Sequence, residues 1–126
     1  MKANELRINN LISHNGLICT VEIINGELNE IYFLGKDFYY SDKTENLDVI
    51  PLTDEWLLKF GFEKESNKSY STGEEIVYSV YRLDELTYNS IQKNWWFNGV
   101  LSNQPIYVHQ LQNLYYALTG EELTII

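Results

Sequence analysis

Apolar residues recur at helical spacing near the end of the chain. On a helical wheel they form one stripe at the 3.6-residue period, made up of Tyr107, Val108, Leu111, Leu114, Tyr115 and Leu118. Gly120 follows the last apolar position and can adopt the left-handed conformation that ends many helices. The pattern therefore predicts an amphipathic helix over residues 108–119.

A shorter helix is predicted over residues 53–60. Thr53 is a favourable N-cap residue, and two acidic residues follow it in the first turn. Gly61 can end the helix. Trp56 and Phe60 are four positions apart, so they share one face, which we expect to pack against a sheet.

Apolar and polar positions alternate in the first fifty residues, as is typical of strands. Between residues 17 and 24 the alternation places Leu17, Cys19, Val21 and Ile23 on one face. Cys19 is therefore predicted to be a small core residue. Further strands are expected at Leu6–Ser13, Glu30–Leu34, Asp37–Tyr40 and Leu47–Ile50. Residues 1–50 should form a small antiparallel meander or an SH3-like partial barrel.

Asn-Gly dipeptides tolerate the positive φ of two-residue hairpin turns. Three are present, Asn15-Gly16, Asn25-Gly26 and Asn98-Gly99, and each predicts a hairpin. Residues 64–75 are polar and are expected to form an exposed loop or hairpin tip. Strands are predicted near residues 76–83, 87–92 and 94–97, with a short one before Pro105.

Together these elements predict a single α+β domain over residues 1–126. Its parts are the meander of residues 1–50, a bridging helix at 53–60, antiparallel strands within 76–108, and the helix at 108–119. We expect the second strand group to pack under that last helix.

Composition narrows the functional classes. The chain has 18 Asp and Glu against 9 Lys and Arg, a net charge of −9, which disfavours binding to duplex nucleic acid. DNA mimicry is the inverse alternative, although the acidic residues are scattered. A single cysteine excludes an intrachain disulfide. No signal peptide or membrane span is apparent, so we expect a cytoplasmic protein.

Few residues could support catalysis. The chain has two histidines, His14 and His109, and one cysteine, and no catalytic or metal-binding motif is recognisable. The adjacent glutamates Glu74-Glu75 and Glu121-Glu122 point in different directions within each pair, so we interpret them as solvated surface charge and not as a catalytic pair of carboxylates. We therefore expect a protein that is not an enzyme and has no cofactor or metal, while carboxylates brought together by folding are the alternative.

The polar side of the predicted C-terminal helix is one candidate binding surface. His109, Asn113 and Tyr116 lie opposite the apolar stripe. The adjoining helix N-terminus has free N–H groups that favour an anion such as phosphate or carboxylate. The alternative is an ordinary solvated face with one exposed tyrosine.

The sequence Asn94-Trp95-Trp96-Phe97-Asn98 is the second candidate. If Trp95 and Phe97 pack inward, Trp96 points outward with the two asparagines. An exposed indole between amides suits base stacking, a partner chain or a dimer interface. The alternative is that a helix or loop covers this face and both tryptophans belong to the core.

Three segments resemble a family of small proteins from phages and prophages of gut-type bacteria. They read M-K-A-N-E-L-R-I, I-P-L-T-D-E-W-L-L-K-F-G-F and Y-V-H-Q-L-Q-N-L-Y-Y-A-L-T-G-E-E-L. The resemblance implies a phage origin, a host-directed accessory role and a location in the host cytoplasm. It assigns no activity or catalytic residue to these positions.

These observations lead to a first functional hypothesis, a non-enzymatic phage protein that binds and sequesters a nucleotide-type immune signal. Arg82 and Lys93 are the candidate phosphate contacts, and the acidic charge opposes this hypothesis. The competing hypotheses are a protein that inhibits a host defence complex through an acidic, tyrosine-rich surface and a virion assembly protein.

Overall fold

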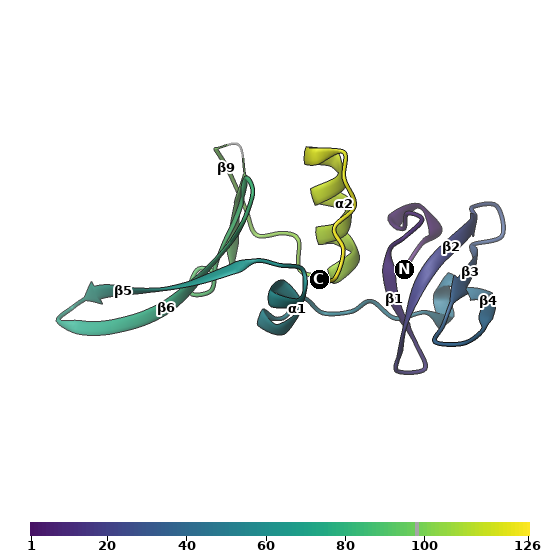
Figure 1. Cartoon of the computed structure of the whole chain (residues 1–126), viewed down its shortest axis with the longest axis horizontal. Helices are drawn as coiled ribbons and strands as arrows, with labels where there is room; N and C mark the ends of the chain where they lie inside the picture. The colour runs from purple at the N-terminus through teal and green to yellow at the C-terminus, as the bar shows by residue number, and fades with distance from the viewer. Residues whose placement is uncertain (98) are drawn as a thin grey trace. The chain divides into compact units, whose positions relative to one another are not determined.

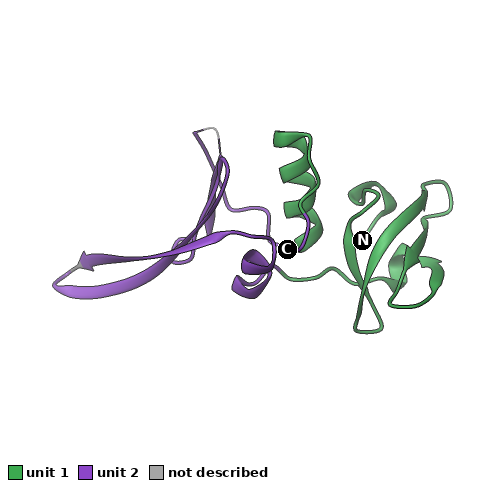
Figure 2. Cartoon of the chain, in the orientation of Figure 1, with its two compact units in different colours: residues 1–51, 107–123 green, residues 52–106, 124–126 purple. Residues whose placement is uncertain are grey.

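The computed structural model describes residues 1–97 and 99–126. Figure 2 shows two compact units, unit 1 (residues 1–51 and 107–123) and unit 2 (residues 52–106 and 124–126). Each unit has its own antiparallel sheet, so the chain belongs to the α+β class, as predicted. That residues 1–126 form one domain stays a prediction. Within the described residues, no helix has the length and apolar content needed to cross a membrane.

Unit 1 contains a four-stranded meander in which the strands pair in chain order (Figure 1). Its elements are η1 (Ala3–Glu5), β1 (Leu11–His14), β2 (Leu17–Asn25), β3 (Glu30–Leu34), β4 (Tyr39–Lys43), η2 (Thr44–Asn46) and α2 (Val108–Thr119). The sheet is open, so of the two predicted arrangements the meander is the one observed.

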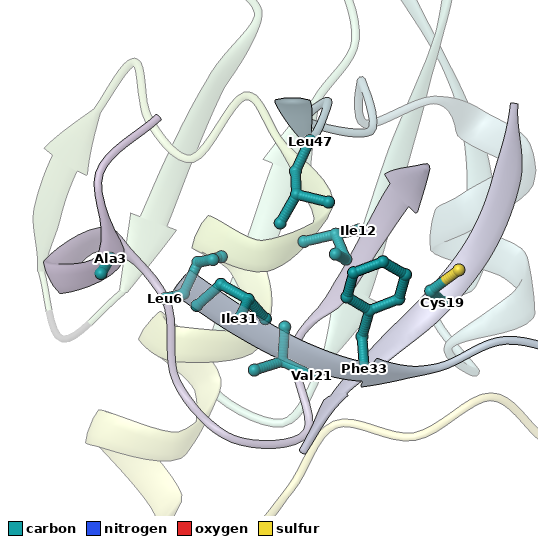
Figure 3. Close-up of a cluster of buried hydrophobic side chains, with 8 residues drawn as sticks. All are labelled: Ala3, Leu6, Ile12, Cys19, Val21, Ile31, Phe33 and Leu47. Atoms are coloured by element: carbon teal, nitrogen blue, oxygen red, sulfur yellow. The ribbon is translucent and has the colours of Figure 1, made fainter. Parts of the chain in front are cut away.

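The core of unit 1 lies on one face of the meander (Figure 3). Cys19 and Val21 of β2 point into it and are buried, which confirms Cys19 as a core residue, and burial raises the pKa of its thiol. Leu17 keeps the predicted face, since it pairs with His14 as Cys19 pairs with Ile12, although it is 63% exposed at the end of the hairpin. The prediction was wrong for Ile23, which is 58% exposed. The pairing register of β2 shifts between Val21 and Ile23, and such a bulge turns the following side chains to the other face.

Two predicted strands of unit 1 are shorter than expected or absent. The chain turns before β1, where Asn9 has a φ of 78° and the Arg7 N–H donates to Asn10 Oδ1 over 2.7 Å. The predicted strand at residues 47–50 is instead irregular, with only an isolated bridge between Ser13 and Asp48. Side-chain hydrogen bonds and a single bridge replace the expected ladders.

The Asn-Gly turns of unit 1 differ from each other. Asn15 and Gly16 both have positive φ, 52° and 81°, and form the predicted two-residue turn between β1 and β2. The second hairpin forms, but its loop runs over residues 26–29. There Asn25 Oδ1 accepts a hydrogen bond from the Leu28 N–H over 3.3 Å, and Asn29 takes the positive φ.

Helix α2 has the predicted bounds and ends at Gly120, whose φ is 74°. The helix belongs to unit 1, where its contacts join it to β1; that the second strand group packs under it stays a prediction. The side chain of Gln112 on α2 makes two hydrogen bonds to the backbone at and just before β1. Its Oε1 accepts from the Leu11 N–H over 2.8 Å, and its Nε2 donates to the Asn9 carbonyl over 3.2 Å.

Unit 2 contains a short helix and a five-stranded antiparallel sheet in chain order (Figure 1). The elements are α1 (Asp54–Lys59), β5 (Glu63–Ser71), β6 (Glu74–Leu83), β7 (Leu86–Asn89), β8 (Asn94–Phe97) and β9 (Val100–Ser102). Thr53 caps α1 by accepting the Trp56 N–H, and the Trp56 and Phe60 rings are 5.6 Å apart, which confirms the predicted cap and shared face.

Residues 64–75, predicted to form an exposed loop or hairpin tip, do include a hairpin tip, but most of the segment is strand and not loop. They form β5, the two-residue turn Thr72-Gly73 and the start of β6, and β5 pairs with β6 from Glu63 to Ser71. Thr72 and Gly73 supply the positive φ values, 51° and 81°, that such a turn requires. Because β5 has polar side chains on both faces, it lacks the period-two apolar signal of a half-buried strand.

Candidate functional site

One face of the five-stranded sheet brings together three of the predicted site residues. Strand pairing aligns a row of residues across all five strands, Glu63, Arg82, Thr87, Trp96 and Leu101. The next row on this face contains Glu65, Val80, Asn89 and Asn94. Residues paired in this way share a face, which we call the outer sheet face. Arg82 and Trp96 are two strands apart, about 10 Å.

The opposite, inner sheet face is covered at its centre. Tyr81, Tyr88 and Trp95 form its central row, and the Phe62 ring meets the Trp95 ring edge-on at 5.9 Å. Trp95 is 1% exposed, and its Nε1 donates to the Pro105 carbonyl over 3.0 Å. The buried indole therefore has both an apolar environment and a partner for its N–H.

Trp96 is on the outer sheet face and is 46% exposed. Its cross-strand neighbour Leu101 is 51% exposed. The alternation predicted for the two tryptophans is thus confirmed, with Trp95 inside and Trp96 outside, while Phe97 is half-buried. An indole and a leucine that are both exposed side by side form an apolar contact point on this face.

The polar residues predicted around Trp96 have separate surroundings. Arg82 is exposed but forms an ion pair with Glu65, so its charge is already balanced. Asn94 is half-buried; its Nδ2 donates to Gln92 Oε1 over 3.3 Å, while its buried Oδ1 has no partner among the described residues. Lys93 is exposed in the turn between β7 and β8, with a φ of 53°. Asn98 lies outside the described residues.

The other three predicted site residues are on α2 in unit 1. His109 is 3% exposed, which contradicts its predicted exposure, and its ring stacks on that of Tyr107 with the centroids 6.1 Å apart. Its Nδ1 is buried without a partner among the described residues. A helical wheel gives the direction of a side chain but not what the rest of the chain places there, so this burial is not readable from the sequence.

Asn113 and Tyr116 hold the N-terminal segment of the chain. Arg7 Nε donates to Asn113 Oδ1 over 3.2 Å, and the guanidinium lies 4.1 Å from the centre of the Tyr116 ring. Arg7 also pairs with Glu122 over 2.5 Å, and this contact lowers the pKa of the Glu122 carboxyl. The polar side of α2 thus makes contacts within unit 1.

The N-terminus of α2 also has fewer free donors than predicted. The Val108 N–H donates to the Ile50 carbonyl over 2.9 Å. The Tyr107 N–H donates to Gln110 Oε1 over 3.2 Å. Because both groups have partners inside the chain, the support for an anion site at this helix end is weaker than the sequence suggested.

The burial of His109 predicts a pH dependence of stability. Burial lowers the pKa of His109, and the charge of Glu5 opposes this only in part. The folded state therefore prefers the neutral imidazole, so its contribution is complete above the unfolded pKa of about 6.5 and is lost as the pH falls below it. Urea unfolding should show that the free energy of unfolding decreases as the pH is lowered from neutral to mildly acidic.

The matched variant for this prediction is His109→Phe, which keeps a buried ring without a titrating group. Its stability should fall less steeply over the same pH range than that of the wild type, because the two proteins differ in this one titratable group. Equal slopes in the two proteins would contradict the assignment to His109.

A small cavity lies on another part of unit 2. It has a volume of about 130 Å³ and is lined by Leu52, Thr53, Asp54, Leu57, Tyr88, Lys93, Asn103, Pro105 and Ile106. This is well below the roughly 300–1,000 Å³ of sites that enclose drug-sized ligands. Beside it, burial and the nearby Asp54 raise the pKa of Tyr81 to about 12, although the buried Tyr81 hydroxyl makes no well-formed hydrogen bond with the described residues.

Unit 1 also has a histidine beside a carboxylate. His14 Nε2 lies 3.1 Å from Asp42 Oδ2. Asn46, the Lys43 N–H and His14 together lower the pKa of the Asp42 carboxyl. Across the described ranges, no three His, Cys, Asp or Glu side chains gather as they would around a metal ion. The pair is accounted for as a structural contact between β1 and β4.

Comparisons with protein-family models, with curated proteins and with solved structures find no match to this chain.

Sequence reasoning missed Leu101 and Thr87 as members of the outer sheet face. The signal for Leu101 is present in the Asn98-Gly99 dipeptide. A two-residue turn at this position pairs Phe97 with Val100 and hence Trp96 with Leu101, the register that the sheet has. Thr87 lies beside Trp96 because β7 pairs with β8. The connection between these two strands is longer than a two-residue turn, so no dipeptide in the sequence indicates their register.

Proposed function

We propose that this protein is a non-enzymatic binding protein whose partner is a protein that docks on the outer sheet face. The observation that carries the proposal is Trp96, which stays about half exposed at 46% beside the similarly exposed Leu101. Tryptophan is enriched among the residues that dominate binding energy at protein interfaces. A sheet face with an exposed indole at its centre is suited to an extended partner surface, in which aromatic residues lie at the core of the interface.

The charges around Trp96 indicate the chemistry of that partner. Glu63 and Glu65 lie on the same face as Arg82, which pairs with Glu65, so the face has an excess of negative charge, as does the whole chain at −9. A basic partner surface would complement it, and an arginine of the partner could stack on the Trp96 indole. The resemblance to phage proteins suggests that the partner is a host protein, such as a component of a defence complex.

A nucleotide-type immune signal is the second candidate ligand. Trp96, Asn94 and Arg82 share the outer sheet face, an arrangement suited to stacking a base and contacting a phosphate. Against it, Arg82 is already paired with Glu65. The cavity described above is also too small to enclose a nucleotide.

The test is capture of a partner from host lysate by immobilised protein after nucleotides have been removed by dialysis. We expect a stoichiometric protein that wild type retains and that Trp96→Ala loses. The matched control is Tyr70→Ala, since Tyr70 is 72% exposed on β5 but lies on the inner-face side of the sheet. No retained protein, together with calorimetric binding of a nucleotide, would favour the second candidate.

A further inference from the structure

Strand β6 is paired on both sides only at residues 80–82. Residues Glu74 to Arg82 pair with β5, whereas β7 pairs only with residues 80–83. Ser79 makes the last contact on the β7 side, through Ser90. Residues 74–78 therefore have an edge to which no strand of the described chain is paired, and Figure 1 shows the β5–β6 hairpin extending beyond β7 within unit 2.

The direction of the free backbone groups on this edge follows from Ser79. Its N–H and its carbonyl both point toward Ser90, with distances of 2.9 Å to Ser90 Oγ and 3.0 Å from the Ser90 N–H. Both groups of one strand residue point to the same side, and the side alternates along the strand. Glu75 and Val77 therefore direct their N–H and carbonyl groups to the free edge, which offers two donors and two acceptors.

The segment has two charged residues, Glu74 and Glu75, followed by two apolar ones. Ile76 is 40% exposed and Val77 is 64% exposed. The outermost strand β5 has the charged residues Glu63, Lys64, Glu65 and Lys68 and no aliphatic residue, whereas the free edge of β6 has exposed aliphatic residues at its centre, where charge would protect it. A two-stranded ribbon alone is marginally stable in water, so a third strand alongside β6 would stabilise it.

We infer that this edge of β6 pairs with the same edge of a second copy of the chain. The free edge has five residues with Ile76 at its centre. A twofold axis at Ile76 sets Ile76 opposite Ile76 of the second copy, Glu75 opposite Val77, and Glu74 opposite Tyr78. Glu75 and Val77 then exchange both backbone bonds with their opposite residues, which makes four intermolecular hydrogen bonds.

This register also suits the charges and the length of the edge. No carboxylate lies directly opposite another, since Glu74 and Glu75 each face an uncharged residue, and like charges directly opposite would destabilise the pair. One position further on, Gly73 in the turn of one copy lies opposite Ser79 of the other. That is the residue at which the β7 side of β6 becomes occupied, so the two copies meet over the whole free edge. The inference is independent of the partner proposed for the outer sheet face.

Disulfide trapping of the full chain tests this register. Ile76 is the centre of a non-hydrogen-bonded pair, in which Cα atoms are about 4.5 Å apart, within the range that a disulfide spans. We expect Ile76→Cys to form a covalent dimer under mild oxidation. The native Cys19 is 3% exposed and should not contribute, so wild type is the background control. Val77→Cys faces Glu75 rather than itself and should cross-link far less.

A second variant removes the pairing without disturbing the hairpin. The Val77 N–H points to the free edge, so Val77→Pro deletes a donor that the chain itself does not use, and proline is tolerated at such edge positions. Light scattering should show a dimer for wild type and a monomer for Val77→Pro, with unchanged far-UV circular dichroism. A monomeric wild type, or equal cross-linking of the two cysteine variants, would overturn the inference.

Discussion

Replacing Trp95 by alanine is expected to destabilise unit 2 by about 3–5 kcal/mol, the usual cost of removing a large buried aromatic side chain. The indole is 1% exposed and meets Phe62 edge-on. Its loss also leaves the Pro105 carbonyl without its Nε1 donor. Urea unfolding followed by circular dichroism, with amide exchange to identify the affected unit, measures this change.

The neighbouring Trp96 provides the matched control for this prediction. Because Trp96 is 46% exposed on the other face of the same strand, Trp96→Ala should change the free energy of unfolding by no more than about 0.5 kcal/mol. Comparable losses for the two variants would mean that the outer sheet face is covered, and would contradict the assignment of Trp96 to an open surface.

Gln112→Leu is expected to destabilise unit 1 although it replaces a polar residue by an apolar one of similar size. Gln112 is 2% exposed and is the partner of the Leu11 N–H and the Asn9 carbonyl. Each buried backbone group left unpaired costs about 1–3 kcal/mol. Urea unfolding measures the sum, and amide exchange should show faster exchange at Leu11.

A control on the same helix separates this effect from helix propensity. Ala117 is exposed on α2, so Ala117→Leu introduces the same residue type at a position without buried partners. Its free energy of unfolding should stay within about 0.5 kcal/mol of wild type. A stability of Gln112→Leu equal to that of this control would show that the two hydrogen bonds contribute little.

Features with a local physical cause could be predicted from the sequence. Both helices have their predicted positions because a cap or a stop glycine lies next to an apolar stripe, as with Thr53 and Gly120. Trp95 and Trp96 point to opposite faces because alternation is a property of the strand itself. These signals need no knowledge of distant residues.

Features that depend on distant parts of the chain could not be predicted. The bulge after Val21 arises in the pairing of β2 with β3 and exposes Ile23. Strand β5 owes its conformation to β6 and not to its own polar residues. His109 is buried although it lies on the polar side of the helical wheel. In each case tertiary context decides the outcome.

For the candidate site, the same division holds. The outward direction of Trp96 followed from local alternation, whereas the ion pair between Arg82 and Glu65 joins two strands whose pairing the sequence did not predict. The assignment of Asn113 and Tyr116 to contacts with Arg7 likewise requires residues more than a hundred positions apart to meet. The exposure of Trp96 and Tyr116 was predicted correctly, whereas the burial of His109 depends on residues far away in the sequence.

The central claim, that the outer sheet face around Trp96 is the binding surface, is tested most directly by calorimetric titration of the captured partner with purified variants. We expect Trp96→Ala to weaken binding by about 30-fold or more, which corresponds to at least about 2 kcal/mol for a dominant interface residue. Tyr70→Ala should stay within about twofold of wild type. Unchanged affinity in Trp96→Ala, with the fold intact by circular dichroism, would contradict the claim.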